Sequence, residues 1–407
     1  MTRWRLAWRN LARNRRRSLL SGSVIAFGFA AMALAGGFML QSFSGLKDTA
    51  IKSGLGHLQF ADARAFDGSE DTTLEYGLSR AAALAAQLGR DPAVAVVMPR
   101  VEFFGLVTAG ARSIPFMGVG VEPDAERRGS HIPGTVERGE WLAAGGRGAV
   151  LGGGLADSLK VGVGDVITLL ATTPDGTLNA VDATVAGIAA VSVKELSERY
   201  LAIPLTLAQE LLDAEDRVSR VSVLLRPDSQ EAATGARLLA ALGGDYPEMT
   251  VRRWDELAVF YGQVKRLYLG IFGFMGGVLV VVVFLATVNT TLMSVTERTR
   301  EIGTLRAIGA RRRPLVAGFL AEGVLLGLVG CGLGALLALG ISLGLNASGI
   351  VMPPPPGFTR GAPIHIEIEP LAYAVAAAAM LVTLLLASYF PARRAARAPI
   401  VESLTHV

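Results

Sequence analysis

The sequence predicts a membrane α-helical protein with four transmembrane helices and a large extracytoplasmic α+β domain of two lobes, inserted between spans 1 and 2. Three observations predict this fold. Four long apolar runs can each cross the roughly 30 Å hydrocarbon layer of a bilayer, which needs about 20 helical residues. Short β-prone stretches and amphipathic helices fill the segment between the first two runs. The chain of 407 residues is 51% hydrophobic and only 18% charged, which is typical of a membrane protein with a substantial water-soluble part.

The apolar runs divide the chain into spans and loops. Within them the only charged residue is Glu322, in the third run. The predicted segments are a cytoplasmic interfacial helix (1–18), the first span (19–43), an extracytoplasmic domain (44–269), the second span (270–293), a cytoplasmic loop (294–314), the third span (315–345), a proline-rich outer loop (346–370), the fourth span (371–390) and a cytoplasmic tail (391–407).

Arginines indicate which side each segment faces. Residues 1–18, 294–314 and 391–407 together hold sixteen arginines against three glutamates, whereas the net charge of the whole chain is only +4. Cytoplasmic loops carry such an excess, so these segments and both termini are predicted to be cytoplasmic. Because the basic residues report membrane orientation, nucleic acid is not a predicted partner.

Residues 1–18 are predicted to form a helix on the membrane surface. Trp4 and Trp8 recur at helical spacing and would lie at headgroup depth. A cleaved signal peptide is the alternative, because Ala33-Leu34-Ala35 resembles a cleavage site. The first apolar run exceeds the roughly 7–15 residues of a signal sequence, which favours a retained span. The predicted interfacial anchor comprises Trp4, Trp8, Arg15, Arg16 and Arg17.

Residues 44–269 are predicted to form a nested domain. A split α/β lobe (about 44–101 and 219–253) would carry an inserted β-rich lobe (about 102–218), and a stalk helix (254–269) would run unbroken into the second span. Ser79 and Ser229 are predicted helix N-caps. The predicted strands are 57–60, 93–97, 103–108, 115–121, 165–170, 183–188, 220–225 and 250–253, and the predicted helices are 79–88, 206–214 and 229–242.

The loop 294–314 has the most distinctive sequence. Its residues 296–310 read TERTREIGTLRAIGA and are followed by three arginines. Ile302, Leu305, Ile308 and Gly309 recur at helical spacing among polar residues, which predicts a short amphipathic helix along the membrane surface. One interpretation is a simple stop-transfer loop, which would carry the same charge. The other is that the amphipathic helix docks into a groove of a partner protein.

The run 296–310 closely resembles the loop after the second span in the ABC transporter permeases of the macrolide-exporter and FtsX-like superfamily (type VII). Residues 6–20 resemble the amino-terminal elbow of these permeases, and residues 388–404 resemble their tail. His57-Leu58-Gln59-Phe60 and the four prolines at 353–356 resemble the lipoprotein-releasing (LolC/LolE-like) branch most closely. The resemblance covers the membrane scaffold through specific motifs and the outer domain through its layout.

In that superfamily the loop is a coupling helix that engages a separate ATPase. The resemblance therefore implies a permease of the bacterial inner membrane, which couples ATP hydrolysis by its partner to motion of its outer domain. Two ATPase copies would bind ATP and Mg²⁺, and a second permease copy or a paralogue would complete the complex. The residues to which the resemblance assigns ATPase coupling are Thr296, Glu297, Arg298, Thr299, Arg300, Glu301, Ile302, Gly303, Leu305, Arg306, Ala307, Gly309 and Ala310.

The lipoprotein-releasing branch implies a lipoprotein cargo, extracted from the membrane and passed to a periplasmic carrier. Two alternatives stay open. One is a signal transmitter, like the cell-division permease, that moves nothing and regulates a cell-wall hydrolase. The other is an exporter of a small amphiphile that works with an adaptor.

No catalytic, cofactor or metal site is predicted in this chain. The glycine-rich stretch 145–156 lacks the Gly-Lys-Ser/Thr step of a P-loop, so ATP binding is expected only in the partner. The stretch 340–344 matches the G-x-S-x-G nucleophile pattern but lies inside an apolar run. The four histidines are scattered, and the single cysteine, Cys331, lies in the third span.

Polar and small residues of the spans are predicted to serve packing. Glycines at 323, 327, 330, 334, 340 and 344 have the spacing that lets helices approach closely, within the chain or at a dimer contact. Glu322 is predicted to extend toward Arg311, Arg312 and Arg313. Asn289 and Thr290 are predicted to form hydrogen bonds between helices.

Overall fold

The computed structural model describes residues 15–67, 74–353, 361 and 363–399. The chain divides into a helical unit, made from residues up to 44, 264–351 and from 363 onward, and a sheet unit made mainly from residues 45–263. Trp4 and Trp8 of the predicted interfacial helix lie outside the described residues, as do the prolines at 354–356.

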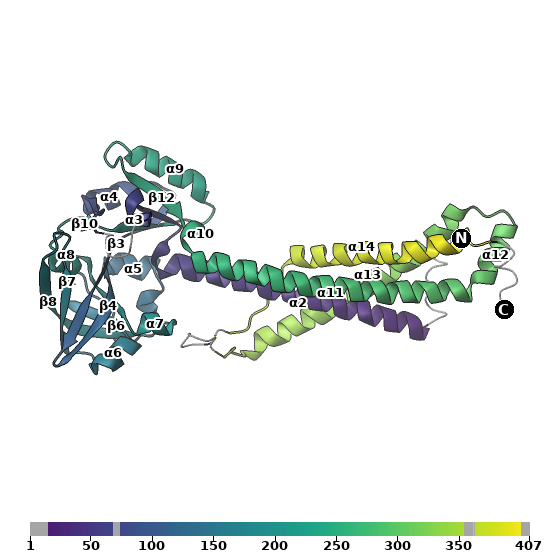
Figure 1. Cartoon of the computed structure of the whole chain (residues 1–407), viewed down its shortest axis with the longest axis horizontal. Coiled ribbons are helices and arrows are strands. Elements are labelled where there is room, and N and C mark those ends of the chain that lie inside the picture. The colour runs from purple at the N-terminus through teal and green to yellow at the C-terminus, as the bar shows by residue number, and fades with distance from the viewer. Residues whose placement is uncertain (1–14, 68–73, 354–360, 362, 400–407) are drawn as a thin grey trace. The chain divides into compact units, whose positions relative to one another are not determined.

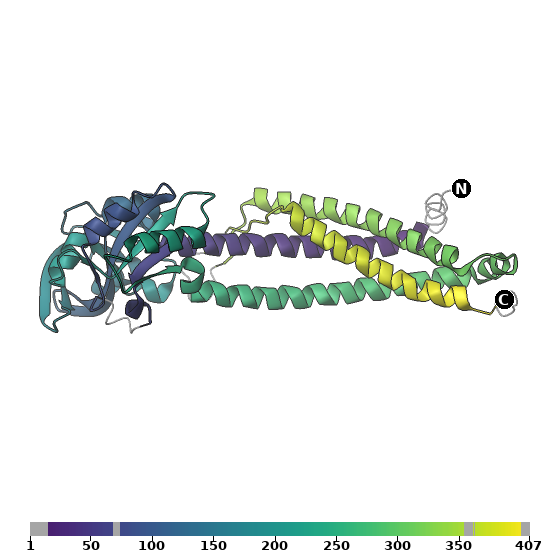
Figure 2. The same ribbon diagram turned by 90° about the horizontal axis from the view of Figure 1, so that it is seen from above.

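The helical unit contains long apolar helices. Within the described ranges, four helices are long and apolar enough to cross a membrane. They lie alongside one another, and a short helix joins the second of them to the third (Figures 1 and 2). Apolar runs form helices in a bilayer because a helix satisfies its own backbone hydrogen bonds. The helices are α2 (Arg15–Ala50), α11 (Val259–Glu297), α12 (Thr299–Ala307), α13 (Arg312–Ser348) and α14 (Pro370–Arg397).

Glycines of α13 allow its neighbours to approach closely. A Cβ atom on Gly334 would lie 2.5 Å from the backbone oxygen of Ala26 in α2. On Gly327 it would lie 2.5 Å from Cδ1 of Leu384 in α14. Gly330 and Gly323 make similar contacts, with α2 and α14 respectively, so the packing role predicted for these four glycines is confirmed. A Cβ atom on Gly340 or Gly344 would meet no atom of the described residues within 4 Å, so these two glycines do not pack against the other described helices.

The sheet unit holds one large sheet. Within the described ranges, ten strands pair in the order β12-β1-β11-β3-β4-β9-β6-β8-β5, with β7 joining β3 to β8, and β2 pairs with β10 separately. The strands are β1 (Leu58–Asp62), β2 (Leu78–Ser79), β3 (Val94–Ala109), β4 (Arg112–Val121), β5 (Val136–Gly139), β6 (Gly148–Gly152), β7 (Val166–Thr172), β8 (Leu178–Ala189), β9 (Tyr200–Pro204), β10 (Arg217–Val218), β11 (Arg220–Leu225) and β12 (Met249–Arg253).

The long strand β3 joins the two halves of the sheet. The segments 93–97 and 103–108, predicted as separate strands, both belong to it. Its pairing with β4 begins only at Arg100, so the missing N–H of Pro99 leaves no gap in that ladder. Beyond Arg100, the strands β3, β4, β9, β6, β8 and β7 form a closed ring. Gly105 allows the closure, because a Cβ atom there would lie 2.2 Å from the backbone oxygen of Leu170 in β7.

Short helices cover the sheet. Leu84 and Leu88 of α4 and Leu238 and Leu242 of α9 are buried in the same core as the strands. The helices of this unit are α3 (Ala63–Asp67), α4 (Ala81–Leu88), α5 (Pro123–Gly129), α6 (Gly153–Leu159), α7 (Lys194–Ser197), α8 (Leu205–Leu211), α9 (Glu231–Leu242) and α10 (Trp254–Leu257), with single turns at Ile51–Leu55 and Ile132–Thr135.

The two predicted N-caps are wrong. Arg80 and Gln230 are the N-cap residues of α4 and α9. Ser79 instead pairs with Arg217 in the small sheet of β2 and β10. Ser229 lies in a turn, where its N–H donates to the carbonyl of Arg226 at 3.3 Å.

The predicted stalk helix is interrupted at Ala258, whose ψ of 69° is not helical. Trp254, four residues before the interruption, is held in the sheet unit. Its indole N–H donates to Glu231 at 3.2 Å, and its ring contacts that of Tyr261 with the centroids 4.9 Å apart. From Val259 the helix α11 continues without a break to Glu297.

We expect an alanine at Gly334 to destabilise the helical unit, because its Cβ would meet the backbone of α2 and not a flexible side chain. Gly334→Ala should lower the free energy of unfolding by about 1–3 kcal/mol. Gly332→Ala is the matched control, since no atom lies within 4 Å of the added Cβ. Thermal unfolding of the full chain in detergent measures both, and equal losses would contradict the packing described here.

The pH dependence of the sheet unit should depend on His57. Its Nδ1 accepts a hydrogen bond from the backbone N–H of Leu225 at 3.1 Å, and burial lowers the pKa of this imidazole. The unfolded chain therefore binds more protons than the folded chain as the pH falls through about 6.5, and stability decreases in that range.

The variant His57→Asn keeps an acceptor near that position and does not titrate. We expect its stability to fall less than that of the wild type between pH 7.5 and pH 5.5. Unfolding can be followed through the fluorescence of Trp141 and Trp254, which are buried in the sheet unit. Equal slopes for the two proteins would show that His57 does not carry the effect.

Candidate functional site

The segment predicted to couple to an ATPase lies at the end of the helical unit where α11 ends and α13 begins (Figure 1). Arg298 separates α11 from α12 with non-helical backbone angles of −112° and 12°. The helix α12 ends at Ala307, and Gly309 follows it with a φ of 96°, which glycine adopts readily. The break at Arg298 and the turn at Gly309 separate α12 from the two long helices.

One side of α12 packs against the ends of the long helices. Ile302 is buried in a cluster with Phe319 of α13 and with Ala392 and Ala395 of α14. A guanidinium N–H of Arg306 donates to the backbone carbonyl of Ala398, just after α14. These contacts anchor α12 to both α13 and α14.

Two large apolar side chains, one in α12 and one just after it, are exposed. Leu305 is 48% exposed and Ile308 is 80% exposed. The sequence pattern grouped Ile302 with these two residues, but the structure places Ile302 inward and the others outward. The other exposed members of the predicted coupling set are Thr296, Glu297, Arg300, Glu301, Ala307, Gly309 and Ala310, whereas Arg298 and Gly303 are buried and Thr299 and Arg306 are half-buried.

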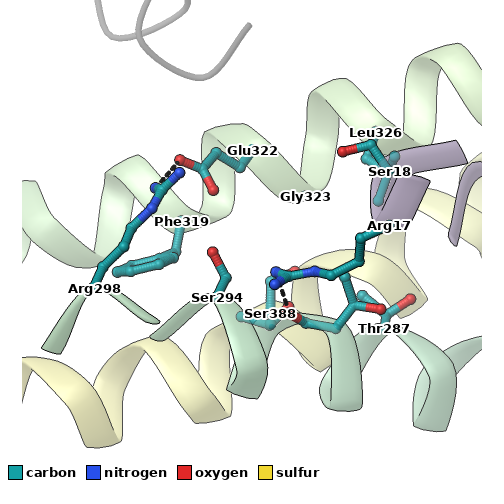
Figure 3. A pocket seen from close by; sticks show the side chains of 12 residues that line it. Arg17, Ser18, Thr287, Ser294, Arg298, Phe319, Glu322, Gly323, Leu326 and Ser388 are labelled. Carbon is teal, nitrogen blue, oxygen red and sulfur yellow. Dashed lines mark hydrogen bonds and ion pairs between the residues drawn. The ribbon is translucent and has the colours of Figure 1, made fainter. Parts of the chain in front are cut away.

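A nearly buried ion pair fixes the start of α12. A guanidinium N–H of Arg298 donates to Oε1 of Glu322 in α13 at 2.8 Å, and the two side chains are 10% and 18% exposed (Figure 3). The sequence predicted that Glu322 extends toward the arginines 311–313, and the structure corrects this. The two partners lie 24 positions apart, so their contact depends on the packing of α11 against α13.

A second set of polar contacts joins α11 to α2. Arg17 forms an ion pair with Glu297 at 3.1 Å and donates to the carbonyl of Thr290 at 2.6 Å. The hydroxyl groups of Thr290 and Ser21 lie 2.7 Å apart, which confirms the predicted contact of Thr290 between helices. Of the predicted interfacial anchor, Arg17 therefore holds helices together, while Arg16 is exposed.

A small polar cavity lies between these two sets of contacts. Its volume is about 50 Å³, and Figure 3 shows Ser294, Ser388 and Thr287 around it together with the two arginines. Among the described residues, Nε of Arg298 and Oγ of Ser388 are buried without a hydrogen-bond partner. Because water needs roughly 10–15 Å³ and polar neighbours, the cavity can hold water that pairs these atoms.

The structure also shows where the residues of the metal-ligand and nucleophile patterns lie. Within the described ranges, no three His, Cys, Asp or Glu residues are grouped closely enough to hold a metal ion. Ser342 of the G-x-S-x-G stretch lies inside helix α13, and not at the turn after a strand that a nucleophile elbow needs.

Comparisons with known proteins agree with this architecture. Residues 18–241 match the model of the MacB-like periplasmic core domain, and residues 273–400 match that of the FtsX-like permease C-terminal region.

Individual relatives are similar over part of their length. The lipoprotein-releasing system transmembrane protein LolE of Haemophilus influenzae is 28% identical over 65% of this chain and 64% of its own length. The macrolide export ATP-binding/permease protein MacB of Wolinella succinogenes is 31% identical over 41% of this chain and 24% of its own. The crystal structure of the periplasmic region of MacB from Actinobacillus actinomycetemcomitans aligns with 51% of this chain and 93% of its own, at 12% identity and a TM-score of 0.39.

We expect Glu322→Gln to destabilise the helical unit by about 3 kcal/mol, because it leaves the charge of Arg298 without its carboxylate in a nearly buried position. Glu297→Gln is the matched control. It removes a pair whose side chains are 22% and 44% exposed, and it should cost less than about 1 kcal/mol. Unfolding of the full chain in detergent measures both, and the account fails if Glu297→Gln is the more damaging.

Proposed function

The chain belongs to the ABC transporter permease family, with a MacB-like periplasmic core domain and an FtsX-like permease region, and we propose that it couples ATP hydrolysis by a separate ATPase to motion of its periplasmic domain. ATP and Mg²⁺ would be bound by the partner ATPase, and this chain would transmit the motion.

The arrangement of α12 is the observation that carries this proposal. Leu305 of α12 and Ile308 just after it are exposed, and the charged residues Arg300 and Glu301 of the same helix are exposed as well. Protein interfaces combine apolar anchor residues with a polar rim, and the exposed face of α12 has both. Its other side is held by Arg298, Ile302 and Arg306, so a force on the exposed face would reach α13 and α14.

The topology of the proposed permease follows from charge and chain order. Its four spans would lie in the bacterial inner membrane with both termini in the cytoplasm. The periplasmic domain would consist of two lobes inserted between the first and second spans. Two such permeases, or this chain and a paralogue, would assemble with two copies of the ATPase.

Lipoproteins are the cargo that we propose. The relative named for lipoprotein release aligns with 65% of this chain, and the relative named for macrolide export aligns with 41%. A lipoprotein would be extracted from the inner membrane and passed to a periplasmic carrier. The second relative supports export of a small amphiphile as the alternative cargo.

Charge reversal on α12 tests the coupling. We expect Glu301→Lys to lower the ATPase rate of the complex to that of the ATPase alone, because it changes the charge of the exposed face without touching the anchors of α12. The chain is expressed with its neighbouring genes, purified by a tag in nanodiscs, and assayed for ATP hydrolysis. Mass spectrometry identifies the proteins that copurify.

The control is Glu195→Lys, an equal charge change at an exposed position of α7 in the sheet unit. It should leave ATPase stimulation unchanged. Full stimulation by Glu301→Lys, or the absence of any copurifying ATPase, would contradict the coupling role. Acylated lipoproteins among the copurifying proteins support release, whereas a cell-wall hydrolase alone would favour a regulator.

A further inference from the structure

Two hollows meet at the end of α14. The first is a groove of about 270 Å³ between α11, α12 and α14, whose walls are mainly apolar and include Leu292, Val295 and Ile302. The second is an open hollow of about 680 Å³ lined by Phe390, the three arginines of α14 and Pro399. Arg394 and Ala398 line both hollows, so the groove and the basic hollow adjoin at these two residues.

The basic hollow is suited to an anion. Arg393, Arg394 and Arg397 are all exposed, and none of them forms an ion pair with a carboxylate among the described residues. Arg393 contacts the ring and hydroxyl of Tyr389, which leaves Arg394 and Arg397 to bind a ligand. Guanidinium groups bind phosphate through paired hydrogen bonds and remain charged at every physiological pH.

The position of these arginines along α14 indicates that the anion is the phosphate of a phospholipid. They follow the apolar part of α14 directly, at the point where a membrane-crossing helix reaches the phospholipid headgroups. Phe390, which is 60% exposed, precedes them, as aromatic residues do at a membrane interface. An apolar groove beside a basic hollow matches an acyl chain beside a phosphate.

We propose that this is a binding site for one anionic phospholipid. Arg394 and Arg397 bind the phosphate, and one acyl chain lies in the groove between α11 and α14, where it touches Ile302 of α12. The site depends on α14 crossing a bilayer and not on coupling to an ATPase. A lipid bound there adds to the contacts that Ile302 and Arg306 already make with α14 and the residue after it.

Native mass spectrometry of the full chain in detergent tests this site, with dioleoyl phosphatidylglycerol and dioleoyl phosphatidylcholine as probes. We expect the wild type to retain the anionic lipid about tenfold better than the zwitterionic one. The double variant Arg394→Gln/Arg397→Gln should lose this preference. Its matched control, Arg311→Gln/Arg312→Gln, removes two exposed arginines that line neither hollow and should keep it.

A second pair of variants tests the groove. Leu292→Trp places a large ring in the groove and should weaken retention of phosphatidylglycerol severalfold, whereas Leu336→Trp, on an exposed face of α13, should not. Equal loss in both arginine variants would show that net charge alone attracts the lipid. That result, an absence of headgroup preference in the wild type, or unchanged retention by Leu292→Trp would each overturn the proposed site.

Discussion

Close packing at the glycines of α13 is the constraint on which the helical unit depends. Through Gly330 and Gly334 this helix touches α2, and through Gly323 and Gly327 it touches α14. Such contacts matter because the hydrophobic effect does not draw helices together inside a bilayer. Glu322 immediately precedes Gly323, so the turn of α13 that admits α14 also presents a carboxylate to Arg298. The anchoring of α12 thus follows from the packing of the spans.

This anchoring explains how α12 can be both exposed and firmly held. Its inward residues contact α13 and α14, while Leu305 and Ile308 face outward. An ion pair that is mostly shielded from water resists displacement more than an exposed one. In the proposed permease, a force on the outer face of α12 would therefore move the long helices with it.

The sequence predicted the elements whose signal is local and missed those that depend on distant partners. Long apolar runs are sufficient to identify the four helices. The pairing of Glu322 with Arg298 could not be predicted, because it requires knowing how α11 packs against α13. For the same reason the continuity of β3 through Pro99 and the pairing of Ser79 were missed, since strand partners decide both. Helical periodicity grouped Ile308 with Ile302. Which of these residues is exposed depends on the helices that α12 packs against, and periodicity does not identify those helices.

Site-specific photo-crosslinking in cells can show whether the exposed face of α12 contacts an ATPase. A photoreactive amino acid replaces Ile308 in one variant and Leu336 in another. Both positions are strongly exposed, but the second lies in the middle of the membrane-length helix α13. The account predicts a covalent product with the ATPase from position 308 and none from position 336. Absence of that product at 308, or an equal yield at both positions, would contradict it.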